Sequence, residues 1–164
     1  MTPAEQTEAS RQVILRMEAA LAANANDMDT YFHDDFRWIG NAGCGTKHGL
    51  PAFRANWQLP LRAAFTDRSY NTHKVIAEGD WVSCFGHIAG THSGPFMGIA
   101  PTGKRVIIPY MDFWHIDAGR IRDNWVSVDF AHVLAQLGHD VFAGEGWESF
   151  DTATRIPPHP EGTP

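Results

Sequence analysis

The sequence predicts an α+β domain in which N-terminal helices cover a curved antiparallel sheet. The first part of the chain spaces apolar residues as helices do, whereas from residue 69 onward the pattern is that of long strands joined by tight turns. The length of 164 residues is close to that of one domain. We therefore expect a single domain over residues 1–150 and a mobile tail over residues 151–164.

Three helical segments precede the long strands. Between residues 5 and 23, apolar side chains recur at the helical period, which indicates an amphipathic helix: Val13, Ile14, Met17, Ala20 and Leu21. Asp27 is placed to cap a short second helix that contains Met28, Tyr31 and Phe32. Residues 49–67 predict a third helix, which we expect Pro60 to break.

A short strand is expected over residues 36–39, before the third helix, and four long strands and a closing helix follow that helix. The long strands are expected over residues 69–78, 81–91, 104–117 and 120–128, with tight turns at Gly79-Asp80 and Ala118-Gly119. The last helix should run from Asp129 to Leu137 and end at Gly138.

Composition argues against several classes of partner. The formal net charge is −6 and no run of Lys or Arg occurs, which disfavours nucleic acid and anionic lipid. No apolar run reaches the roughly 20 residues that span a bilayer, and the polar N-terminus does not fit a secretory signal, so we expect a cytoplasmic protein. Cys44 and Cys84 lack metal-ligand spacing; a disulfide between them is possible but not required.

Aromatic residues are abundant, with six Trp, ten Phe and three Tyr. They are compatible either with a core built from large side chains or with a pocket walled by aromatic rings. A pocket of the second kind suits flat organic ligands. The expected partner is thus a small hydrophobic molecule that contains carbonyl groups.

Two motifs connect the sequence to a known family. Residues 90–103 read GTHSGPFMGIAPTG, and downstream Trp125, Asp129 and the run Gln136-Leu137-Gly138 form W-x3-D…QLG. Together with FHDDFRW at residues 32–38, they resemble the SnoaL-like polyketide cyclases and ester cyclases over roughly residues 10–140. The resemblance implies the cone-shaped fold of the nuclear-transport-factor-2-like (NTF2-like) proteins, which is often dimeric. That fold also hosts isomerases, hydrolases and non-catalytic binding modules.

Asp129 and His87 are the candidate catalytic residues. Asp129 follows the last strand, where it can cap the last helix or act as a general base whose pKa is raised by burial. His87 should lie beside Pro109 if Lys104 pairs with His92, which would bring it within reach of Asp129. There it could stabilise an enolate or deliver a proton.

Strand register decides which face of the sheet lines the pocket. A three-residue turn at residues 117–119 places Met111 opposite Trp125, so that odd-numbered residues share a face with Asp129. A two-residue turn would shift the parity and bring Tyr110 or Ile108 to that face. With the first register, the expected substrate-binding residues are Trp38, Trp57, Phe85, Phe96, Met97, Met111, Phe113, His115, Trp125 and Ser127.

The resemblance implies intramolecular aldol-type ring closure of a polyketide-like ester, with Asp129 as the base. Such chemistry requires neither a metal nor an organic cofactor. A related isomerase or hydrolase, and a non-catalytic binding or dimerisation module, remain alternatives. The helices are too few to cover both faces of the sheet, so we also expect an exposed apolar face and a homodimer.

Overall fold

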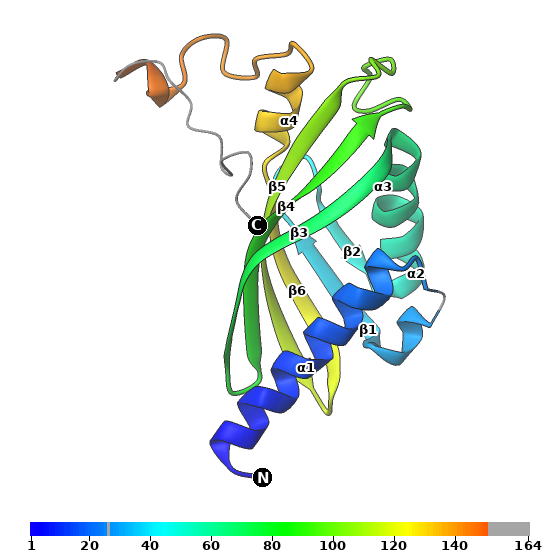
Figure 1. The fold of residues 1–164 in the computed structure, drawn as a ribbon, viewed down its shortest axis with the longest axis vertical. Helices are drawn as coiled ribbons and strands as arrows, with labels where there is room; N and C mark the ends of the chain where they lie inside the picture. The colour runs from blue at the N-terminus through cyan, green and yellow to red at the C-terminus, as the bar shows by residue number, and fades with distance from the viewer. Residues whose placement is uncertain (26, 151–164) are drawn as a thin grey trace.

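A computed structural model describes residues 1–25 and 27–150; the predicted tail over residues 151–164 lies outside the described residues. A curved, six-stranded sheet dominates the fold, and the N-terminal helix α1 crosses its concave side (Figure 1). The predicted α+β class is therefore confirmed. No helix of the described part is long and apolar enough to cross a membrane.

The helices and strands follow the predicted order. The helical segments are α1 (Pro3–Ala22), η1 (Met28–Thr30), α2 (Gly49–Phe53), η2 (Arg54–Gln58), α3 (Leu59–Ala64), α4 (Phe130–Gln136) and η3 (Trp147–Phe150). The strands are β1 (Phe32–Gly40), β2 (Thr46–His48), β3 (Phe65–Glu78), β4 (Trp81–His92), β5 (Arg105–Asp117) and β6 (Arg120–Val128). The strand order is β2-β1-β6-β5-β4-β3, in which only β1 and β6 run parallel.

Helix α1 begins with a complete capping box and carries its apolar stripe onto the sheet. The Thr2 side chain accepts a hydrogen bond from the Glu5 backbone, and the Glu5 carboxylate accepts one from the Thr2 backbone. The expected stripe is buried, with Ile14 and Met17 at its centre. Their burial positions α1 over the concave face, where it forms one wall of a cavity.

The third helical segment differs from the prediction because Pro60 does not break it. The chain stays helical from α2 through the π-helix η2 into α3, and Pro60 lies in the first turn of α3. Gln58 and Leu59, which precede it, are themselves helical, so Pro60 lies within a continuous helical run and removes one N–H donor from it. The wider π-helical turn immediately before Pro60 changes the hydrogen-bonding pattern of the helix, and this change accommodates a residue that lacks an N–H donor.

The hairpin between β5 and β6 also differs from the preferred register. Its turn has two residues, Ala118 and Gly119, which both adopt positive φ angles, so that Asp117 pairs with Arg120. A bulge then restores the pairing of odd with odd residues, and Met111 faces Ser127 instead of Trp125. The predicted pairing of His87 with Pro109 is confirmed.

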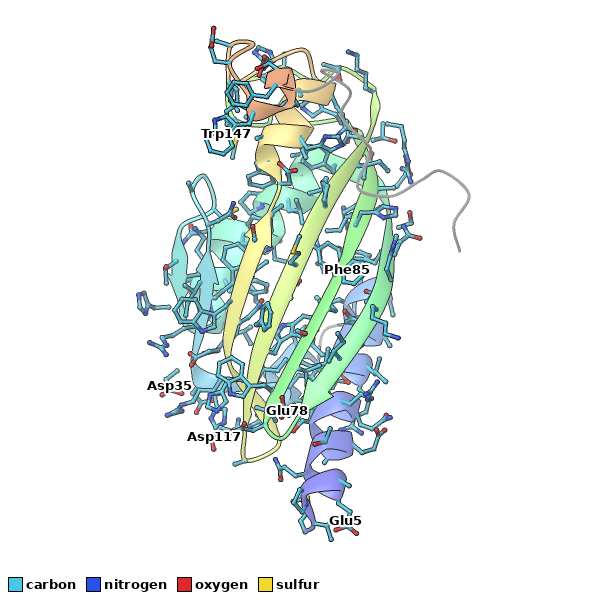
Figure 2. The ribbon with its side chains drawn as sticks, turned by 90° about the vertical axis from the view of Figure 1, so that its left-hand side faces the viewer. Glu5, Asp35, Glu78, Phe85, Asp117 and Trp147 are labelled. Carbon is cyan, nitrogen blue, oxygen red and sulfur yellow. The ribbon has the colours of Figure 1, made fainter. Side chains whose placement is uncertain are left out.

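The two faces of the sheet have different environments. Even-numbered residues of β4 and β5, such as Ile88 and Ile108, face α1 and are buried. Odd-numbered residues point the other way, and Figure 2 shows Phe85 on the side of the sheet turned away from α1. Because no described helix covers that side, it forms the exposed outer face of the sheet.

Candidate functional site

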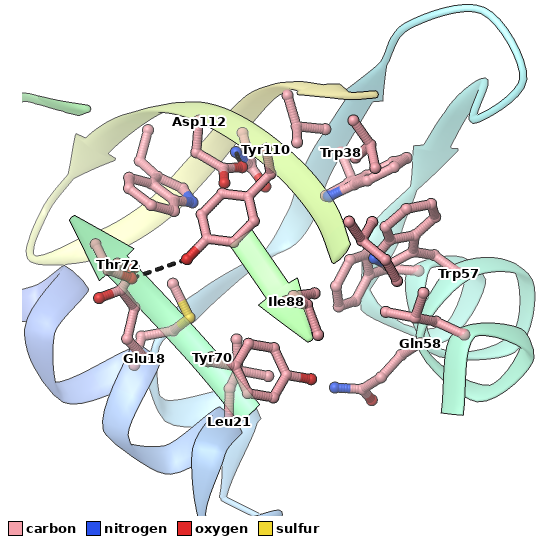
Figure 3. Close-up of a pocket in the computed structure, with 18 of the residues that line it drawn as sticks. Glu18, Leu21, Trp38, Trp57, Gln58, Tyr70, Thr72, Ile88, Tyr110 and Asp112 are labelled. Atoms are coloured by element: carbon pink, nitrogen blue, oxygen red, sulfur yellow. Dashed lines mark hydrogen bonds between the residues drawn. The ribbon is translucent and has the colours of Figure 1, made fainter. Parts of the chain in front are cut away.

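A cavity of about 130 Å³ lies between the concave face of the sheet and the helices (Figure 3). Side chains of α1, η2 and α3 form one side, and even-numbered residues of the central strands form the other. The cavity opens on the side of Tyr70, because this is the lining residue with the most exposed side chain, at 37%. Its volume is below the roughly 300 Å³ at which pockets for drug-sized ligands begin, so the enclosed part holds only a portion of a larger molecule.

Aromatic rings build the wall beside η2. The Trp38 and Trp57 rings lie 4.3 Å apart between centroids and are tilted by 32°. Trp57 also contacts Phe130, which in turn packs against Phe96. These contacts hold the two indoles in the cavity wall, where their apolar rings suit an aromatic ligand.

The opposite wall carries a carboxyl group in an apolar setting. Asp112 is only 8% exposed, and its Oδ1 atom accepts a hydrogen bond of 2.8 Å from Nδ2 of Asn124, itself buried. Burial raises the pKa of Asp112 to about 7; the negative charge of Glu18 adds to this shift, and the hydrogen bond from Asn124 opposes it. A carboxyl group with such a pKa can both take up and release a proton near neutral pH.

A chain of polar groups runs along the wall next to α1. The Tyr110 hydroxyl lies 2.9 Å from Thr72 Oγ1, which donates a hydrogen bond of 3.2 Å to Glu18 Oε1. The Cys84 thiol contacts the same Glu18 oxygen at 3.7 Å. Burial is the main cause that raises the pKa of Glu18, while the hydrogen bonds from Thr72 and Cys84 oppose it. Burial also raises the pKa of Tyr110, so this phenol stays protonated and can donate a hydrogen bond.

Comparison with known proteins identifies the family. Residues 11–137 match the SnoaL-like polyketide cyclase family. The chain belongs to this family. It is 31% identical over 125 residues to nogalonic acid methyl ester cyclase from Streptomyces nogalater, covering 74% of this chain and 91% of that protein. The resemblance found from the sequence motifs is thus confirmed.

Solved structures show that the fold is that of the NTF2-like SnoaL proteins. AclR from Streptomyces galilaeus, described as a hydroxylase, superposes with a TM-score of 0.70 at 22% identity, covering 80% of this chain and 82% of that one. A protein from Jannaschia sp. CCS1, described as a SnoaL-like polyketide cyclase, gives 0.71 at 19% identity, covering 85% and 95%. Since these names differ in activity, this likeness establishes the fold alone.

Of the predicted site residues in this SnoaL-like chain, only Trp38 and Trp57 line the cavity. The odd-numbered strand residues instead lie on the outer face, because the face that meets the helices is the even-numbered one. This group comprises Phe85, His87, Met111, Phe113, His115, Trp125 and Ser127. Phe96 is buried against Phe65 and Phe130, outside the cavity lining, and Met97 is exposed in the connection between β4 and β5.

Asp129 lies at the start of α4 and does not line the cavity. Its Oδ1 atom accepts a hydrogen bond of 2.8 Å from the backbone N–H of His132 and caps the helix. The capping alternative for Asp129 is therefore the one that the structure shows. The expected grouping of His87 with Asp129 does not form in the cavity, since His87 lies on the outer face next to His73.

The family motif at residues 90–103 has a structural role in this chain. His92 is fully buried, and its Nδ1 atom lies 3.0 Å from the Thr102 hydroxyl, which ties the two ends of the connection together. The backbone N–H groups of Ser93 and Gly94 both bond to the carbonyl of Ala64, at the end of α3. The motif thus anchors the helix that carries part of the cavity wall.

Sequence reasoning missed Asp112, Asn124 and Glu18. Asp112 is the only charged residue in the stretch VIIPYMDFW, residues 106–114, and shares the even parity of its buried neighbours. Glu18 occupies the apolar stripe of α1, one residue after Met17 and four after Ile14. A charged residue within an apolar stripe was the signal available for both.

Proposed function

We propose that this SnoaL-like protein closes a ring in a flat, polyketide-like molecule by intramolecular aldol chemistry, with Asp112 as the general base and acid. The observation that carries the proposal is the position of Asp112, buried at the cavity wall with a pKa near 7. The relative named as an ester cyclase supports the substrate class.

The reaction requires one proton to leave and return. The ionised Asp112 takes a proton from a carbon flanked by two carbonyl groups, and the resulting enolate carbon forms a bond to a ketone carbon of the same molecule. The ketone oxygen then becomes an alkoxide and recovers the proton from Asp112. No atom is lost, so no co-reactant is required. Asn124 holds the carboxyl group by its hydrogen bond and thereby fixes the position of the base.

Tyr110 is placed to stabilise the enolate. Its hydroxyl lies 2.9 Å from Thr72 Oγ1, and because Thr72 donates its own proton to Glu18, the Tyr110 O–H donates to Thr72. Rotation of this O–H would let it donate to a developing oxyanion in the cavity, where such a hydrogen bond is strong. The indoles of Trp38 and Trp57 hold the planar part of the substrate, so that much of the rate gain comes from orientation.

The test is turnover by wild type and Asp112→Asn, with nogalonic acid methyl ester and the corresponding free acid as probes. Ring closure leaves the mass unchanged, so products are separated by chromatography. We expect Asp112→Asn to lower kcat at least ~100-fold, the usual contribution of a general base. Asp129→Asn, which keeps an acceptor for the α4 cap, is the control and should retain activity. Equal turnover by Asp112→Asn and wild type would refute the assignment.

We also propose a homodimer formed through the outer face of the sheet. Exposed apolar side chains gather on the central strands of this face, with Met111 63%, Phe113 54% and Trp125 50% exposed. A patch of this kind on a soluble protein marks an interaction site. Sedimentation should show a dimer that Met111→Glu converts to monomer, whereas Leu15→Glu, at an exposed position of α1, should not. A monomeric wild type at micromolar concentration would contradict the proposal.

We further propose a cytoplasmic location, in which thiols stay reduced. Cys44 and Cys84 are both free and buried, which suits a reducing compartment. Fractionation of expressing cells with an antibody to the chain is the direct measurement, and recovery in an exported fraction would contradict it.

A further inference from the structure

A basic side chain lies in the cavity lining with neither a hydrogen-bond nor an ion-pair partner among the described residues. Arg62 is partly buried on α3, and it is the only basic side chain that the described residues place along the cavity. Within residues 1–25 and 27–150 it makes neither a hydrogen bond nor an ion pair. Other partly buried arginines of the chain are held, as Arg68 is by the carbonyl of Phe65 and Arg120 by that of Phe32.

Helical spacing directs Arg62 toward the cavity. Trp57, Gln58, Leu61 and Arg62 all line it and recur at i, i+1, i+4 and i+5, which is one face of a helix. Leu59, on the other side of the same helix, is 58% exposed. The guanidinium therefore shares a face with the aromatic wall instead of the solvent-facing side.

Two further polar side chains accompany Arg62 where the cavity opens. Tyr70 on β3 and Gln58 on η2 both line the cavity, and Figure 3 shows their polar ends pointing toward one another. Tyr70 is partly exposed, whereas Asp112 is buried. The cavity thus has a mouth rich in hydrogen-bond donors, aromatic walls, and a carboxyl group at its buried end.

We propose that Arg62 is a specificity-determining residue that binds an anionic oxygen group of the substrate, such as a free carboxylate, at the cavity mouth. The inference rests on the proposed function, because it assigns the other end of the same substrate to Asp112. A guanidinium offers two parallel N–H groups that match a carboxylate, and the amide of Gln58 and the hydroxyl of Tyr70 can donate to the same group. A neutral ester lacks the charge for this pairing, so the chain should prefer an acid to its methyl ester.

The other charged groups of the cavity are compatible with an anion. Asp112 and Glu18 would repel one when ionised, but burial raises the pKa of both carboxyl groups and so weakens this repulsion near neutral pH. Arg62 also lies in the last turn of α3, where a basic residue stabilises the free carbonyl groups of the helix end. A purely structural role of this kind predicts a loss of stability without any change in ligand preference, which separates the two explanations.

The experiment is isothermal titration calorimetry with 2-naphthoic acid and methyl 2-naphthoate, a pair that differs in charge and hardly in shape. We expect wild type to bind the acid about tenfold more tightly, equivalent to about 1.4 kcal/mol. Arg62→Gln should abolish the preference by weakening binding of the acid alone, and Arg62→Lys should restore part of it. Arg54→Gln is the matched control, because Arg54 lies about two turns earlier on the same helical segment, outside the cavity lining, and pairs with Asp29.

Equal affinity of wild type for acid and ester would overturn the proposal, and so would failure of the acid to bind at millimolar concentration. An equal loss of both ligands in Arg62→Gln would assign the residue a structural role. The same titration on Asp112→Asn separates the two proposals. If Asp112→Asn keeps both turnover and the acid preference, the proposed base is wrong while the role of Arg62 stands.

Discussion

Replacing Asp112 by asparagine should make the stability of the protein less dependent on pH. Burial raises the pKa of this carboxyl group from an ordinary 3.8 to about 7, so the folded state holds the proton more tightly than the unfolded state does. Its contribution is fully present below about pH 4 and is lost as pH rises through 7. At 1.36 kcal/mol per unit, the loss above pH 7 is about 4 kcal/mol, and more than half of it falls between pH 5 and pH 8.

Asparagine has nearly the same shape, keeps an oxygen that can accept from Asn124, and does not titrate. The difference in unfolding free energy between Asp112→Asn and wild type should therefore increase by about 2–3 kcal/mol, in favour of the variant, from pH 5 to pH 8. Urea denaturation at four pH values measures it. Asp34→Asn, at a fully exposed carboxylate, is the control and should follow wild type. Parallel pH curves for Asp112→Asn and wild type would refute the raised pKa.

Three further predictions concern other parts of the molecule. Asp129→Ala removes the α4 cap and should lower the unfolding free energy by about 1 kcal/mol in urea denaturation, leaving naphthoate affinity unchanged. Gly94→Ala would place a methyl group against the carbonyl oxygen of Ala63, so we expect a loss of about 1–3 kcal/mol, and a variant as stable as wild type would disprove this packing. Burial raises the pKa of Cys44 to about 11 and also raises that of Cys84, so both thiols should react with iodoacetamide at pH 8 at least ~100-fold more slowly than in urea, as followed by mass spectrometry.

The arrangement of helices and strands was predictable because it depends on local signals. The apolar period of α1 and the turn residues Gly79-Asp80 and Ala118-Gly119 each indicate a boundary without reference to distant residues. The strand β6, Arg120–Val128, has the predicted limits. The short β2 was missed because Thr46–His48 is too brief to show an alternating pattern.

The face that lines the cavity was harder to predict because both faces of the central strands carry large apolar residues. Tyr110 and Trp114 face inward while Met111 and Phe113 face outward, so aromatic content did not discriminate between them. The interpretation relied on the parity of Asp129 instead. The chain leaves the sheet after Val128, and the alternation of a strand no longer applies to the residue that follows.

The placement of Asp112 argues for chemistry more than for stability. On the inner face of β5, Asp112 is flanked by Tyr110 and the buried Trp114, with the buried Ile108 beyond Tyr110, so an uncharged residue would suit the site without the cost of a buried carboxyl group. Near neutral pH that cost is a few kcal/mol, a large share of the stability of a domain this size. A single hydrogen bond from Asn124 offsets only part of it. What the carboxyl group provides in return is a base with a pKa close to working pH, held in an aromatic cavity where a carbon acid can be brought against it.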